Sequence, residues 1–84
     1  MKITWTKTAW EDYLYWQKQD KNKLKRINEL IKYTLREPFS GIGNPEALKH
    51  DLQGYWSRRI DGEHRLVYSY SNETLLIIAC RYHY

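Results

Sequence analysis

Hydrophobic residues follow a helical period in the first half of the chain and an alternating period in the second half. Between positions 8 and 36, apolar residues recur every three or four positions, which is typical of amphipathic helices. From position 47 onward, short alternating runs are separated by turn-forming residues, which is typical of strands. This single change predicts an α+β fold in which two N-terminal helices pack on a twisted, mainly antiparallel sheet.

Both helices are expected after a short strand-like segment at 2–5. Thr8 and Glu11 have the spacing of a capping box, so the first helix is expected to begin there. Asp20 can cap a second helix, which should end before Pro38 because the residue preceding a proline avoids the helical conformation. The expected apolar faces consist of Trp10, Tyr13, Leu14 and Gln17 in the first helix, and of Leu24, Ile27, Ile31, Thr34 and Leu35 in the second.

Four strand-like runs, at 47–52, 55–60, 64–70 and 75–82, are joined by short turns and predict an antiparallel meander. A three-residue loop at 61–63 brings apolar residues together on one face, whereas a two-residue loop would pair them with Arg65 and Val67. Hydrophobic burial favours the first register, which also sets Arg59 opposite Arg65 on the other face. Two facing guanidinium groups repel, and a bound anion would offset that cost. The apolar residues brought together are Trp56, Ile60, Leu66 and Tyr68.

The last strand has a different pattern, since residues 75–80 are apolar at both parities. A strand of this kind belongs inside a sheet with both faces covered. Cys80 is therefore expected to be a core residue.

Composition limits the class of protein and of partner. Eighty-four residues predict a single domain spanning 1–84. A formal charge of +4 and an aromatic content of 15% favour an anionic partner that can stack on rings. A lone cysteine excludes an internal disulfide, and the longest apolar run is far shorter than the roughly 20 residues that a membrane helix needs, so a cytoplasmic protein is expected.

A basic flank on the two helices has two interpretations. Projected at helical pitch, it is either a solvated surface or a stripe that contacts phosphates. It consists of Lys18, Lys21, Lys25, Lys32 and Arg36.

Known cofactor and nucleophile motifs are missing, and the three histidines lack the spacing of metal ligands, so neither a cofactor nor a metal site is expected. Cleaving RNA without a metal requires a base for the ribose 2′-hydroxyl, an acid for the departing 5′-oxygen and cations for the phosphorane. A carboxylate, an imidazole and an arginine suffice. The C-terminal half supplies candidates in Glu46, Lys49, Arg58, Arg59, Arg65, Arg81 and His83.

Four segments, at 45–49, 55–60, 63–68 and 79–84, resemble the YoeB family of RelE-superfamily toxins, whose fold is similar to that of microbial ribonucleases. The resemblance extends over essentially the whole chain at matching length. It implies the toxin of a toxin–antitoxin pair, which enters the ribosomal A site and cuts mRNA, leaving a 2′,3′-cyclic phosphate. It also implies a YefM-like antitoxin, the ribosome with its RNA and mRNA as partners, and a possible homodimer.

Carried onto this sequence, the resemblance assigns a role to six residues. Glu46 would be the general base, His83 the general acid, and Arg65 would stabilise the phosphate in the transition state. The residues that complete the family's site are Lys49, Arg59 and Tyr84.

Two other classes of function compete with this interpretation. A non-enzymatic RNA- or ribosome-binding module would use the basic residues on phosphates and the aromatic residues on bases. The pair of Glu46 and His83 favours an enzyme, because a binder gains little from placing a carboxylate against RNA. A helix-pair DNA binder is disfavoured, because no helix-turn-helix sequence joins the two helices.

Overall fold

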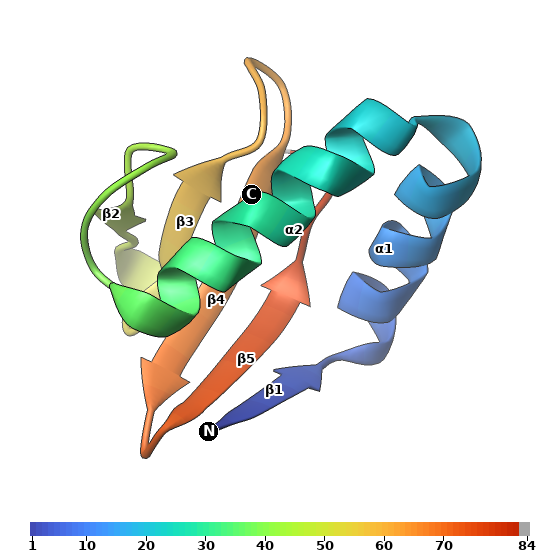
Figure 1. The fold of residues 1–84 in the computed structure, drawn as a ribbon. Helices are drawn as coiled ribbons and strands as arrows, with labels where there is room; N and C mark the ends of the chain where they lie inside the picture. Colours follow the sequence, from blue (N-terminus) through green and yellow to red (C-terminus); the bar gives the residue numbers. More distant parts are fainter. Residues whose placement is uncertain (83–84) are drawn as a thin grey trace.

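The computed structural model describes residues 1–82 and has two helices on one face of a mixed sheet (Figure 1). The strand order is β1-β5-β4-β3-β2, with β1 parallel to β5 and the other neighbours antiparallel. The expected α+β fold is confirmed. The elements are β1 (Lys2–Trp5), α1 (Lys7–Gln19), α2 (Lys21–Arg36), β2 (Glu46–Ala47), a 3₁₀ turn η1 (His50–Leu52), β3 (Trp56–Arg59), β4 (Arg65–Ser71) and β5 (Thr74–Ala79).

Helix α2 follows the sequence pattern closely. Asp20 caps it, since its Oδ1 accepts hydrogen bonds from the backbone N–H groups of Asn22 at 3.0 Å and Lys23 at 3.2 Å. The helix ends at Arg36, two residues before Pro38. Its buried side chains match the expected face with the addition of Leu30, and they are Ile27, Leu30, Ile31 and Thr34.

Helix α1 begins earlier than expected and turns a different face to the sheet. Thr6 is the cap, and its Oγ1 accepts a hydrogen bond from the Ala9 N–H at 3.1 Å. The buried residues are Ala9 and Trp16, whereas Trp10 is 46% exposed and lies in the face expected to be buried. The prediction failed because two apolar stripes lie side by side on this helix, and the small Ala9 is the one that permits close packing on the sheet.

The second half of the chain forms the expected meander with two corrections. The run at 47–52 is not a strand, because β2 ends at Ala47 and the chain then makes the turn η1, with His50 at a φ of 58°. Strand β5 ends at Ala79 and lies between β1 and β4, as expected for an apolar strand. Only one of its faces is fully covered, since Leu76 and Ile78 are half-buried. Cys80 is a core residue. Its burial, and to a smaller extent the negative charge of the nearby Asp12, raise the pKa of its thiol to about 12.

The hairpin between β3 and β4 is held by Asp61. Its Oδ1 accepts hydrogen bonds from the backbone N–H groups of Glu63 and His64 at 2.7 and 2.6 Å, and its Oδ2 lies 2.8 Å from Lys23 Nζ on α2. Burial alone would raise the pKa of Asp61. The bonds from Lys23 and from the two backbone N–H groups outweigh burial and lower the pKa from 3.8 to about 2.

Replacing Asp61 by Asn should therefore destabilise the fold in a pH-dependent way. The amide keeps an oxygen for the two backbone N–H groups but loses the charge that attracts Lys23, at a cost of about 1 kcal/mol in the free energy of unfolding at pH 7. A carboxyl pKa that is lower in the folded state stabilises above the unfolded-state value of 3.8 and loses that effect as the pH falls toward 2. Urea unfolding at pH 7 and at about pH 2.5 measures the difference.

Asp51→Asn, an exposed substitution on η1, is the control and should cost little at either pH. An advantage of the wild type over Asp61→Asn that stays constant down to pH 2 would contradict the assignment.

Candidate active site

The sheet face opposite the helices carries the candidate site. In the pairing of β3 with β4, Arg59 lies opposite Arg65, as the sequence predicted, and both project away from the face that packs on the helices. Glu46 pairs with Ser57 on the adjacent strand, and side-chain alternation places Glu46 on this same face. The outer side of the sheet thus gathers one carboxylate and two guanidinium groups from three neighbouring strands.

Glu46 and Arg65 are in contact. Arg65 Nη1 lies 3.5 Å from Glu46 Oε1, and the Arg65 side chain is only 11% exposed, whereas that of Glu46 is 48% exposed. A guanidinium that is partly withdrawn from water is well suited to holding an oxyanion. A carboxylate beside it that reaches the solvent can accept a proton from a bound substrate.

The remaining predicted site residues are placed less closely. Arg59 and Lys49 are exposed, and Lys49 directly precedes the turn η1, three positions after Glu46. His83 and Tyr84 lie outside the described residues, 1–82. Tyr82, which precedes them, is bound to β4, since the Arg65 N–H donates a hydrogen bond to the Tyr82 carbonyl at 3.0 Å. The last described residue is therefore tied to the backbone of Arg65.

Arg58 is not a phosphate-contacting candidate, contrary to its place in the sequence-based set. It is fully buried, and its guanidinium donates hydrogen bonds to the Tyr68 hydroxyl at 3.0 Å and to three loop carbonyls. The signal that could have identified this role is parity, because Arg58 alternates with Trp56 and Ile60 on the core face. The three carbonyls belong to Glu37, Ser40 and Ile42.

These bonds fix the loop that leads into β2. The Arg59 N–H adds a bond to the Gly43 carbonyl at 2.6 Å. Gly43 has a φ of 80°, and a Cβ there would lie 2.9 Å from Leu30 Cδ2 and 3.1 Å from Arg58 Cβ, so the loop approaches the core at a position that only glycine fits. The loop and β3 together determine the position of Glu46, the first residue of β2.

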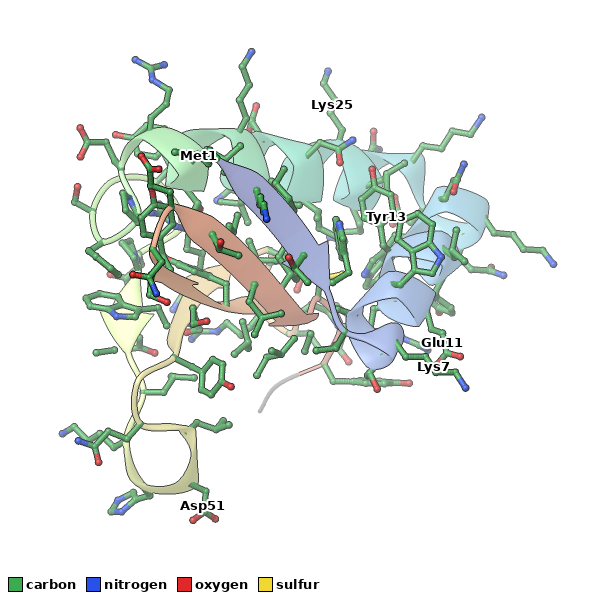
Figure 2. All side chains as sticks on the ribbon, turned by 90° about the horizontal axis from the view of Figure 1, so that it is seen from below. Met1, Lys7, Glu11, Tyr13, Lys25 and Asp51 are labelled. Atoms are coloured by element: carbon green, nitrogen blue, oxygen red, sulfur yellow. The ribbon has the colours of Figure 1, made fainter. Side chains whose placement is uncertain are left out.

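The basic flank of the helices lies away from this site. All five of its residues are exposed. Figure 2 shows Lys25 pointing from α2 away from the sheet, whereas the turn carrying Asp51 extends on the opposite side of the molecule. Any contact made by this flank is therefore separate from the contacts of Glu46 and Arg65.

The comparisons with known proteins assign the chain to a family. A family model described as a YoeB-like toxin of bacterial type II toxin–antitoxin systems matches residues 5–84. This chain belongs to the YoeB family. The toxin YoeB of Escherichia coli strain K12 is 62% identical over 84 residues, which is 100% of both chains. The resemblance found in the sequence is thereby confirmed, and the protein is the toxin of a toxin–antitoxin system.

Solved structures of the family share the fold. A YoeB/ParE toxin from Agrobacterium tumefaciens is 50% identical with a TM-score of 0.96, covering 100% of both chains. A YoeB dimer from Staphylococcus aureus is 49% identical with a TM-score of 0.93, covering 100% of this chain and 98% of that one. A heterotetrameric YoeB–YefM complex from Staphylococcus aureus is 51% identical with a TM-score of 0.92, covering 98% of this chain and 95% of that one.

None of the helices described over residues 1–82 is long and apolar enough to cross a membrane.

The two neighbouring arginines of β3 test whether the buried Arg58 holds the loop while the exposed Arg59 does not. Replacing Arg58 by Gln should lower the free energy of unfolding by about 3 kcal/mol, because the loop carbonyls lose the donors of a buried guanidinium. The same change at the exposed Arg59 should cost less than about 0.5 kcal/mol. Chemical denaturation of both variants measures the contrast, and equal losses would show that the buried guanidinium does not hold the loop.

Proposed function

We propose that the protein is a ribosome-dependent endoribonuclease that cleaves mRNA in the ribosomal A site and so stops translation. The observation that carries the proposal is the contact between Glu46 and Arg65, with Arg59 opposite Arg65 on the same exposed face. A base and two neighbouring cations on one sheet face are what phosphodiester cleavage through the 2′-hydroxyl requires.

Glu46 takes the proton of the ribose 2′-hydroxyl, and the 2′-oxygen attacks the adjacent phosphorus. The bond from phosphorus to the 5′-oxygen then breaks, and His83 donates the proton that the 5′-oxygen needs. Arg65 and Arg59 offset the negative charge that builds up on the non-bridging oxygens, and Lys49 and Tyr84 bind the substrate around them. The products are a 2′,3′-cyclic phosphate and a 5′-hydroxyl, and side chains alone carry the protons.

The shape of the described surface supports the proposed dependence on the ribosome. Over residues 1–82 the protein has no pocket that could orient a flexible RNA strand. In-line attack requires the 2′-oxygen, the phosphorus and the 5′-oxygen to be aligned, and holding reactants in such a geometry supplies a large part of a rate enhancement. A ribosome that presents mRNA in a fixed path supplies that alignment.

Glu46→Gln tests the enzymatic role against a binding module. The amide keeps the size of the side chain but accepts no proton, so cleavage on programmed ribosomes should fall by a factor of about 100 to 10,000. Co-sedimentation with ribosomes should change little, since the cations are intact. His83→Gln should behave in the same way.

Glu11→Gln, an exposed change on α1, serves as the control and should cleave like the wild type. Wild-type protein that binds ribosomes without cutting mRNA would favour the binding module, and undiminished cleavage by both Glu46→Gln and His83→Gln would exclude the proposed roles.

Two protein partners are proposed from the relatives. The YoeB–YefM complex of Staphylococcus aureus supports a YefM-like antitoxin as the inhibitor of this chain, and the YoeB dimer from that organism supports a homodimer. The exposed apolar residues of β1 and α1 are suited to contact with the second copy, because exposed apolar surface favours protein contacts. Figure 2 shows Tyr13 beside β1 and Met1 at the start of that strand. The exposed members are Met1, Ile3, Trp10 and Leu14, at 67%, 44%, 46% and 42%.

Trp10→Lys should therefore convert a dimer to a monomer in sedimentation velocity runs. The side chain stacks on Tyr13 with ring centroids 5.7 Å apart, and a lysine would bring two like charges together across a symmetric interface. Phe39→Lys is the control, because Phe39 is 48% exposed but lies after α2. A Trp10→Lys variant that dimerises normally, or that loses only antitoxin binding, would assign this surface to another partner.

A further inference from the structure

Tyr82 is held by both of its backbone groups. Its N–H donates a hydrogen bond to His64 Nδ1 at 2.7 Å, and its carbonyl accepts one from the Arg65 N–H at 3.0 Å. The residue has a φ of 64°, a left-handed conformation that is unfavourable in a residue other than glycine. Such a conformation persists only where the surroundings fix it, and here two consecutive residues at the start of β4 do so.

His64 is itself fixed and largely withdrawn from solvent, with 8% of the residue exposed. Its backbone N–H donates a hydrogen bond to Asp61 Oδ1 at 2.6 Å, and its imidazole ring packs edge-on against Trp16 with ring centroids 4.8 Å apart. Since Nδ1 accepts the Tyr82 N–H, the ring proton of a neutral imidazole belongs on Nε2, which lies 3.6 Å from Glu63 Oε1. His64 is thus an oriented acceptor for a single backbone N–H.

The residues just before Tyr82 are tied to the same part of the core. Trp16 Nε1 donates a hydrogen bond to the Cys80 carbonyl at 2.7 Å, and the Cys80 N–H donates to Asp12 Oδ2 at 3.0 Å. The guanidinium of Arg81 lies 3.4 Å from the centroid of the Tyr15 ring. Residues 80–82 are therefore fixed one after another, and His64 supplies the last side-chain contact before position 83.

We propose that His64 is a positioning residue for the cleavage reaction, which holds the peptide of Tyr82, the residue that precedes His83 in the chain. The inference rests on the proposed function, in which His83 is the general acid. His64 does not touch the substrate in this account. It acts through one hydrogen bond, and the loss of that bond frees the Tyr82 peptide next to the proposed acid.

Two substitutions of nearly equal shape separate this role from packing. Asn at position 64 can place an amide oxygen where Nδ1 lies, whereas Leu has the same branching but no acceptor. His64→Leu should lower kcat on programmed ribosomes by a factor of about 30 or more, which is part of the roughly 100- to 10,000-fold contribution of a general acid. His64→Asn should stay within about fivefold of the wild type, and ribosome affinity and KM should be unchanged in both.

The Tyr82 amide provides a readout that does not depend on catalysis. Its hydrogen exchange, followed by NMR, should be slow in the wild type and His64→Asn, and faster by a factor of about 10 or more in His64→Leu. If His64→Leu does not fold, His64→Gln replaces it, because the glutamine oxygen reaches the position of Nε2 rather than that of Nδ1.

The outcomes separate the two proposals. Equal cleavage by His64→Leu and His64→Asn, or a loss confined to KM, would overturn the positioning role while leaving the nuclease intact. Equal protection of the Tyr82 amide in both variants would likewise overturn it. A wild type that cuts no mRNA on ribosomes would overturn the proposed function, and the role of His64 in catalysis with it.

Discussion

The pairing of β3 with β4 is the constraint on which the rest of the structure depends. Because side chains alternate along a strand, this one register sends Arg58 into the core and Arg59 to the open face, and it sets Arg59 opposite Arg65. A shift by one residue would expose the Arg58 guanidinium, which holds the loop, and bury that of Arg59, which lies on the opposite face. The hairpin bonds of Asp61 protect this register at its closed end.

Two further segments take their positions from these strands. On one side, Arg58 binds loop carbonyls and thereby fixes the chain that leads to Glu46. On the other, His64 and Arg65 bind the backbone of Tyr82, from which His83 follows. The residues proposed as base and acid are far apart in the sequence, and each is reached from an arginine or histidine of the same hairpin. The segments that lead to Glu46 and to position 83 are thus both held by one hairpin.

Local patterns made part of this structure predictable from sequence. The sequence predicted the cap and buried face of α2 from hydrophobic periodicity, and the register of β3 with β4 from the length of the turn. These features depend on residues that are close together in the sequence. The prediction of the buried face of α1 was wrong because this helix has two apolar stripes. Only packing against the sheet selects Ala9 over Trp10 for burial. The role of Arg58 was missed because charge alone favours the surface, although its parity indicated the core. The contact between His64 and Tyr82 joins residues far apart in sequence and left no local signal.

The central claim is that Glu46 and the cations around it promote cleavage of RNA by attack of the RNA's own ribose 2′-hydroxyl on the phosphorus. End-group analysis of mRNA fragments from programmed ribosomes tests this claim most directly. The account predicts a 2′,3′-cyclic phosphate on the upstream fragment and a 5′-hydroxyl on the downstream one. A 5′-phosphate on the downstream fragment would show that water, and not the ribose, attacks the phosphorus, and would contradict the proposed chemistry.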